Sequence, residues 1–242
     1  MLELIRPDWP APGNVRAFST TRNGGFSEGP WSSLNFGDHC GDNPDYVKQN
    51  RELLRTLLPG KPRWLRQVHG NRVFTWDEAG DPEPEADAIF SKQPEQVCAV
   101  LTADCLPVIF CNKAGTEVAA AHAGWRGLAA GILQATVSAM NCTPADLIAW
   151  LGPAIGPRTF EVGNDVYDSF VDLNTENAYA FKPHRDRWLA DLYELARLAL
   201  TRVGVTQISG GQHCTYEEQD KFFSFRRDSD TGRMATAIWL ER

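Results

Sequence analysis

Six short runs with strand composition lie between Arg63 and His122, and this stretch constrains the fold more than any other part of the chain. The runs read RWLRQVH, RVFTW, ADAIF, VCAVLTAD, LPVIFCN and TEVAAAH, and turn-forming residues separate them. Apolar, β-branched runs of this length, bounded by turn signals, are typical of core strands. The stretch therefore predicts several strands of a buried sheet.

Helical patterns flank these strands. Asn43 and Pro44 form a cap and first-turn pair, and apolar residues then recur at helical spacing until Pro59. The same patterns predict three later helices, one beginning near Trp125 and the others at Asn164 to Leu173 and Trp188 to Val203. Further strands are expected at Val15 to Thr21, Ile148 to Leu151, Thr206 to Ser209, Phe222 to Arg226 and Met234 to Leu240. The polar stretch between residues 22 and 44 predicts a long loop, and loops of this length are often functional.

Composition narrows the classes of function. The 242 residues can bury a full core, and we expect one domain spanning residues 1–242. No apolar run approaches the roughly eighteen residues of a membrane helix, and no targeting segment is visible, which predicts a cytoplasmic protein without a membrane partner. Six cysteines without a C-x-x-C pair predict free thiols. A net charge of −7 with scattered basic residues argues against a nucleic-acid partner, and no obligate protein partner is evident.

Three potential metal ligands each end a predicted strand: His69 in QVHG, Cys105 in TADCLP and His122 in HAGWRG. They are 36 and 17 residues apart, a separation that fits ligands from several strands rather than a zinc finger. Two imidazoles and a thiolate leave a fourth tetrahedral position open, where a bound water has its pKa lowered toward ~7. The alternative is that each is a satisfied core residue, although the small or turn-forming residues Gly70 and Gly124 beside them favour a site.

Two further residues are candidates beside this site. Asp104 adjoins Cys105, and it can serve as a general base or orient a ligand if the strand ends there; otherwise its carboxylate braces the flanking loop. Arg126 lies in the first turn of the helix after His122, where it is a candidate phosphate partner or a solvated residue. The adjacent pairs His39–Cys40 and His213–Cys214 are expected to be structural, since neighbouring side chains seldom bind one metal.

The order of motifs resembles the YfiH family, also called the laccase-domain, polyphenol oxidase or multifunctional purine nucleoside enzyme family. The motifs that carry the resemblance are TRNGGFS, SLNFGDHCGDNP, QVHG, TADCLP, HAGWRG, GPAIGP, FEV and FFSFRRD. The resemblance implies an α+β fold with four α/β/β/α layers in which mixed sheets pack between helices, similar to the catalytic domain of cytotoxic necrotizing factor. It also implies zinc bound by His69, Cys105 and His122.

The resemblance implies an activity as well. Family members cleave adenosine, inosine, guanosine and methylthioadenosine with phosphate, and deaminate adenosine, so purine nucleosides and phosphate are the expected partners. By analogy Arg22, Asn35 and Arg226 are candidates for lining the pocket, although each could equally brace a loop.

Two other activities stay open at this stage. One is a copper-dependent laccase, against which the count of five histidines argues. The other is an amide hydrolase in which Cys105 is the nucleophile and which edits serine-containing peptidoglycan precursors. Metal binding discriminates this hydrolase from the zinc enzyme, because a zinc-bound thiolate is poorly available as a nucleophile.

Overall fold

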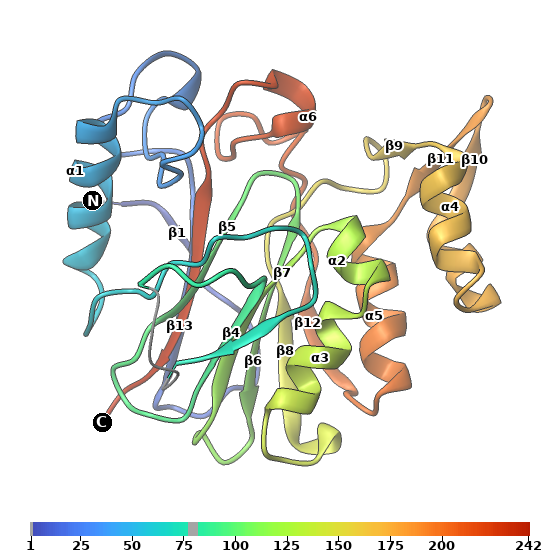
Figure 1. Ribbon diagram of the computed structural model, residues 1–242, viewed down its shortest axis with the longest axis horizontal. Helices are drawn as coiled ribbons and strands as arrows, with labels where there is room; N and C mark the ends of the chain where they lie inside the picture. Colours follow the sequence, from blue (N-terminus) through green and yellow to red (C-terminus); the bar gives the residue numbers. More distant parts are fainter. Residues whose placement is uncertain (1, 77–81) are drawn as a thin grey trace.

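Two β-sheets pack face to face, and helices cover both outer surfaces (Figure 1). The computed structural model describes residues 2–76 and 82–242. The larger sheet has the order β12-β8-β6-β7-β4-β3. Its strands are β12 (Gln207–Gly210), β8 (Leu147–Leu151), β6 (Leu106–Asn112), β7 (Val118–Ala123), β4 (Ala88–Ser91) and β3 (Val73–Thr75).

The second sheet is antiparallel and has the order β1-β2-β13-β5. Its strands are β1 (Leu4–Ile5), β2 (Val15–Thr20), β13 (Met234–Leu240) and β5 (Cys98–Thr102). A small third sheet, β10-β11-β9, stands apart from the two main sheets in Figure 1. Its strands are β9 (Glu161–Val162), β10 (Phe181–His184) and β11 (Arg187–Ala190).

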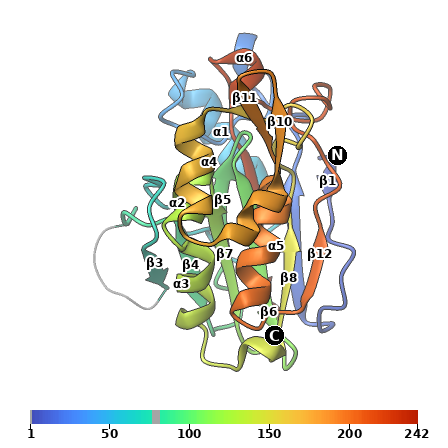
Figure 2. The ribbon, with the colours of Figure 1, turned by 90° about the vertical axis from the view of Figure 1, so that its right-hand side faces the viewer.

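The helices lie on opposite sides of the paired sheets. Helix α1 (Pro44–Arg55) covers the four-stranded sheet, whereas α3 (Ile132–Ala139) and α5 (Leu192–Arg202) run side by side over the six-stranded sheet (Figure 2). The remaining helices are α2 (Trp125–Ala129), α4 (Asn164–Val171) and α6 (Phe225–Asp228), with 3-10 turns at Gly29–Trp31, Pro144–Asp146 and Thr175–Ala180.

Side-chain alternation along the strands produces the layers. On β6, Val108 and Phe110 face the α3 and α5 side, whereas Ile109 and Cys111 face the other sheet. Strand β13 alternates in the same way, with Ile238 between the sheets and its neighbours toward α1. Each sheet is thus apolar on both faces, which places three core layers between four layers of structure. The expected α+β, four-layer arrangement is confirmed.

Four local expectations were wrong. The segment from Arg63 to His69 makes only isolated bridges, because the Gln67 side chain bonds both the N–H and the carbonyl of Leu101 at 2.8 Å in place of a ladder. The helix predicted from Trp125 is two helices, since Gly131 between them has φ of +85°.

The other two concern the C-terminal third. Trp188 belongs to β11 rather than to the following helix, which begins only after Asp191, whose side chain accepts from the N–H of Glu194. The predicted strand from Phe222 is instead a turn into α6, because the Ser224 hydroxyl caps that helix.

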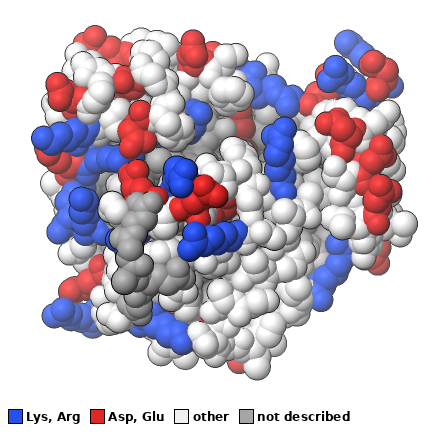
Figure 3. All heavy atoms as spheres, viewed as in Figure 1, with Lys and Arg blue, Asp and Glu red and all other residues white. Residues whose placement is uncertain are grey.

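Charges of both signs are interspersed on the face shown in Figure 3, where no stripe of one sign appears. Among the described residues, no helix is both long and apolar enough to cross a membrane.

Candidate metal centre and its cavity

Three segments bring His69, Cys105 and His122 together at one end of the six-stranded sheet. Cys105 immediately precedes β6, and His122 lies near the end of β7, the strand paired with β6. His69 comes from the loop before β3. The three ligand atoms lie within 4.8 Å of one another, and the thiol of Cys105 is 3.8 Å from Nε2 of His69. The structure therefore assembles the three residues that the motifs single out.

The three side chains differ in burial. His122 is only 3% exposed, Cys105 is half-buried and His69 is exposed, so the group opens toward solvent on one side. The two imidazole rings meet edge to face, with centroids 4.8 Å apart. Backbone conformation contributes to this convergence, because His69 has a left-handed φ of +60°. Such values are uncommon for non-glycine residues and cluster at functional sites.

Asp87, which the sequence analysis missed, supports two members of the group. It is fully buried just before β4, and its Oδ1 lies 2.8 Å from Nδ1 of His122. The same carboxylate accepts hydrogen bonds from the backbone N–H groups of Val68, His69 and Gly70. A charged residue inside the apolar run ADAIF is the signal that could have revealed it, since an acid is almost never fully buried unless it is paired.

Proximity shifts the acidities of these groups. Burial raises the pKa of the Cys105 thiol, but His122 and His69 lower it by a larger amount, and the resulting pKa is about 6. Burial lowers the pKa of His122, yet the Cys105 thiolate and the Asp87 carboxylate raise it to about 9. Burial also raises the pKa of Asp87, but bonds from His122, Gly70 and Val68 hold it below its ordinary value. Cys105 and His122 thus form a thiolate–imidazolium pair in the metal-free protein.

The group fits a metal ion. A thiolate and two imidazoles suit zinc and copper, and the hydrogen bond from His122 Nδ1 to a carboxylate is the usual support of a metal-bound histidine. Space is also kept free at Gly124, where a Cβ would lie 2.9 Å from the Cys105 sulfur and 3.0 Å from Cδ2 of His69. Any larger residue there would push the ligands apart.

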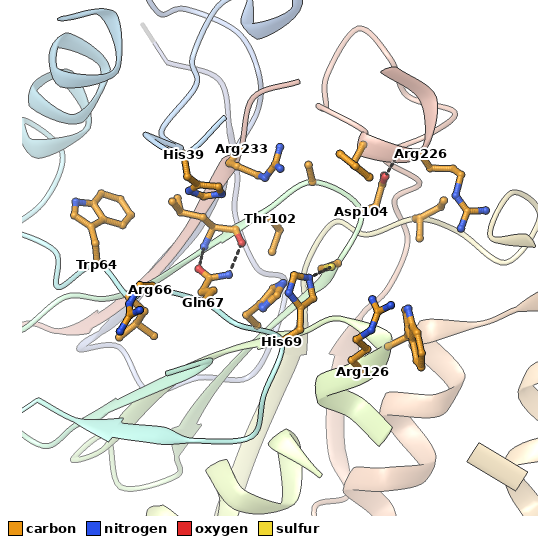
Figure 4. A pocket seen from close by; sticks show the side chains of 18 of the residues that line it. His39, Trp64, Arg66, Gln67, His69, Thr102, Asp104, Arg126, Arg226 and Arg233 are labelled. Atoms are coloured by element: carbon orange, nitrogen blue, oxygen red, sulfur yellow. Dashed lines mark hydrogen bonds between the residues drawn. The ribbon is translucent and has the colours of Figure 1, made fainter. Parts of the chain in front are cut away.

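The three side chains His69, Cys105 and His122, together the metal group, lie in the wall of a cavity of about 950 Å³ (Figure 4). Cavities of roughly 300–1,000 Å³ hold small-molecule ligands. Arginines and aromatic residues share the lining, which makes the site suited to an anion together with a flat ring. These residues are Arg51, Arg66, Arg126, Arg226, Arg233, Trp64, Trp125, Phe160 and Phe225.

Three of the other predicted residues line this cavity. Asp104, with φ of +82°, accepts hydrogen bonds from the hydroxyl of Thr215 at 2.6 Å and from the N–H of Arg226 at 2.7 Å. The Arg226 guanidinium donates to the carbonyl of Glu161. Arg126 stacks over the Trp125 ring, with its Cζ 4.4 Å from the centroid.

The other two predicted residues lie outside the cavity. Arg22 donates to the carbonyls of Ser32 and Gln219 and lines a separate, shallower hollow. Asn35 is fully buried, and its side-chain Oδ1 accepts from the backbone N–H of Arg233. The structure therefore places both where they brace loops.

Sequence reasoning also missed most of the other lining residues, and three of them illustrate the reason. His39, expected to be structural, lies in the cavity wall together with Arg233 (Figure 4), and Phe225 lines the same cavity. Phe225 is 57% exposed although it is a large apolar residue. All three come from polar loops or a four-residue helix, where periodicity gives no direction to the side chains.

Comparisons with known proteins support a single family over nearly the whole chain. A family model described as multi-copper polyphenol oxidoreductase laccase matches residues 16–241. The Escherichia coli protein named purine nucleoside phosphorylase YfiH is 56% identical over 99% of this chain and 100% of its own length. A Haemophilus influenzae purine nucleoside phosphorylase is 49% identical, over 99% and 100% of the two chains.

Solved structures agree with these matches. A Neisseria meningitidis protein superimposes with a TM-score of 0.95 at 52% identity and covers 99% of both chains. The Bacillus licheniformis protein YfiH gives a TM-score of 0.88 at 32% identity, over 94% of this chain and 93% of its own. Proteins named YfiH thus appear among both the sequence relatives and the solved structures.

Proposed function

Because the chain belongs to the multi-copper polyphenol oxidoreductase laccase family, together with the YfiH purine nucleoside phosphorylases, we propose that it is a zinc-dependent purine nucleoside phosphorylase that also deaminates adenosine. The observation that carries the proposal is the His69–Cys105–His122 group in the wall of an arginine-lined cavity. Adenosine, inosine, guanosine and methylthioadenosine are the proposed substrates. A zinc ion held by these three side chains would supply Lewis acidity there.

Arg126 is the residue best placed to hold phosphate. Within residues 2–76 and 82–242, its guanidinium makes no hydrogen bond or ion pair and only stacks on Trp125. The other cavity arginines are committed to carboxylates or carbonyls. Arg51 and Arg66 pair with Asp38 and Glu85, and Arg226 and Arg233 donate to Glu161, Thr231 and Gly232. A guanidinium with free donors matches the oxygens of phosphate.

Phe225 provides a surface for the purine. An exposed aromatic ring in a cavity wall offers a face on which a base can stack. In phosphorolysis, an oxygen of the phosphate that Arg126 holds forms a bond to C1′ of the ribose as the bond from C1′ to N9 breaks. The electron pair stays on the purine, which takes up a proton. In deamination, water adds at C6 and ammonia leaves.

The test is product formation with a defined metal content. The zinc-loaded protein is incubated with inosine, with and without phosphate, and hypoxanthine and ribose 1-phosphate are quantified; adenosine is tested for conversion to inosine. We expect phosphate-dependent cleavage that Cys105→Ser and His122→Ala abolish. The matched controls Cys142→Ser and His184→Ala, which change a cysteine and a histidine outside the cavity, should retain the activity.

Other outcomes separate the competing activities. If neither free base nor inosine forms, the nucleoside assignment is wrong. Oxidation of a phenolic dye only by the copper-loaded protein would support the laccase, and release of serine from a peptidoglycan precursor by the metal-free protein would support the hydrolase.

A further inference from the structure

We propose that Asp87 is a positioning residue that sets the geometry of the metal group through two of its three members. The inference rests on the proposed metal site but not on the nucleoside chemistry. Asp87 precedes β4, the strand that pairs with β7 next to His122, and its own carbonyl accepts the N–H of His122 at 2.7 Å. Backbone pairing therefore holds the two residues side by side before their side chains interact.

The first function of Asp87 is to orient the His122 ring. A carboxylate can only accept, so the contact of 2.8 Å requires that Nδ1 of His122 carries the proton. The ring then presents the lone pair of Nε2 to a metal ion. A carboxylate behind a metal-binding histidine fixes the tautomer in this way in many metal sites.

The second function is to hold the loop that carries His69. The Asp87 carboxylate accepts from the N–H groups of Val68 at 3.2 Å, His69 at 2.9 Å and Gly70 at 2.7 Å. Three successive N–H groups directed at one carboxylate fold the chain around it, with His69 in its left-handed conformation. Asp87 thereby links a loop ligand to a strand ligand.

The stoichiometry makes the carboxylate hard to replace. Two carboxylate oxygens offer about four acceptor positions, and four donors occupy them here. An asparagine has the same shape but presents two donors in place of one acceptor oxygen. In Asp87→Asn, the amide would meet either backbone N–H groups or the Nδ1 proton of His122, so the loop or the ring must turn.

The test measures metal binding rather than turnover. Zinc affinity is determined by competition with a chromophoric chelator for the parent, for Asp87→Asn and for the matched control Asp42→Asn. Asp42 is also buried and accepts three hydrogen bonds, from Ser27, Asn35 and Asn43, but it touches none of the three ligands. We expect the zinc dissociation constant to rise roughly 10- to 100-fold in Asp87→Asn, and to stay near the parent value in the control.

A second measurement needs no variant at Asp87. In zinc-loaded protein labelled with ¹⁵N-histidine, the His122 signal, assigned by its loss in His122→Ala, should show a proton kept on Nδ1 and zinc on Nε2. If Asp87→Asn does not fold, this signal decides the question.

The results that overturn the inference are distinct. They are zinc on Nδ1 of His122, equal loss of affinity in both Asp→Asn variants, or a parent that binds no zinc. A parent that binds zinc but does not cleave nucleosides would refute the proposed function only, and both Asp87 measurements would still decide its role.

Discussion

Gly124→Ala tests whether Cys105 and His69 are held at fixed positions as ligands. The backbone at Gly124 has φ of −62° and ψ of 160°, which alanine adopts without strain. The effect of the substitution is therefore steric. The new methyl group would lie 2.9 Å from the Cys105 sulfur and 3.0 Å from Cδ2 of His69, whereas comfortable contacts are about 3.5–4.0 Å.

The size of the effect follows from that overlap. Relieving it requires a ligand shift of roughly 0.5–1 Å, several times the ~0.2 Å within which metal–ligand distances are held. Overpacking of this kind costs about 1–3 kcal/mol. If the strain is relieved by displacing the ligands, zinc affinity should fall by roughly 5- to 140-fold, since about 1.4 kcal/mol corresponds to a factor of ten.

The measurement is a zinc competition titration, together with the absorption spectrum of the cobalt-substituted protein, which reports ligand geometry. Gly70→Ala is the matched control, because a Cβ there would meet Asp87 and Val68 at ordinary distances of 3.5 and 3.6 Å. Parent-like zinc affinity and an unchanged cobalt spectrum in Gly124→Ala would show that Cys105 and His69 do not both bind the metal ion.

Three further predictions concern other groups. In metal-free protein the Cys105 thiol, whose pKa is about 6, should react with iodoacetamide half-maximally near that pH, and zinc should suppress the reaction. Burial raises the pKa of the Cys111 thiol to about 12, so Cys111 should not contribute to that midpoint. A midpoint near pH 9 for Cys105 would contradict the thiolate–imidazolium pair. Arg126→Ala should raise the KM for phosphate roughly 10- to 140-fold, the equivalent of a lost charged hydrogen bond of about 1.5–3 kcal/mol, and should leave the KM for inosine nearly unchanged. Arg126→Lys should recover part of the loss. Equal effects on both KM values in steady-state kinetics would show that Arg126 does not hold the phosphate. Asn43→Ala should lower the free energy of unfolding by about 1 kcal/mol in urea denaturation, because its side chain caps α1 by accepting from the N–H of Asp45, and zinc affinity should not change.

The metal group is predictable from sequence because each ligand ends a recognisable segment. Small residues or a proline beside His69, Cys105 and His122 mark these motifs. The structure places only His122 near the end of a strand, β7, whereas Cys105 immediately precedes β6 and His69 lies in the loop before β3. The group's support is less predictable. Asp87 has no periodic signal of its own, and its role arises only when β4 pairs with β7.

The dependence on tertiary contacts also explains the errors in the predicted fold. Strands such as β13, with apolar residues on both faces, are found because burial dictates the pattern. The segment from Arg63 to His69 also carries apolar residues, but it bonds through the Gln67 side chain, a tertiary interaction that composition does not encode. Arg22 and Asn35 show the converse, since residue type alone cannot separate an arginine that braces a loop from one that meets a ligand.

The arrangement of ligands bears on the two chemistries that the relatives' descriptions name. A multi-copper oxidase needs several copper sites, yet among residues 2–76 and 82–242 one group of three His, Cys, Asp or Glu side chains can hold a metal. Any phenol oxidation by the copper-loaded protein would have to use that same group. Cys105→Ser would then abolish both phenol oxidation and phosphorolysis. In the parent, the bound metal would determine which of the two reactions occurs. Retention of dye oxidation in Cys105→Ser would require a second metal site and would contradict this view of the cavity.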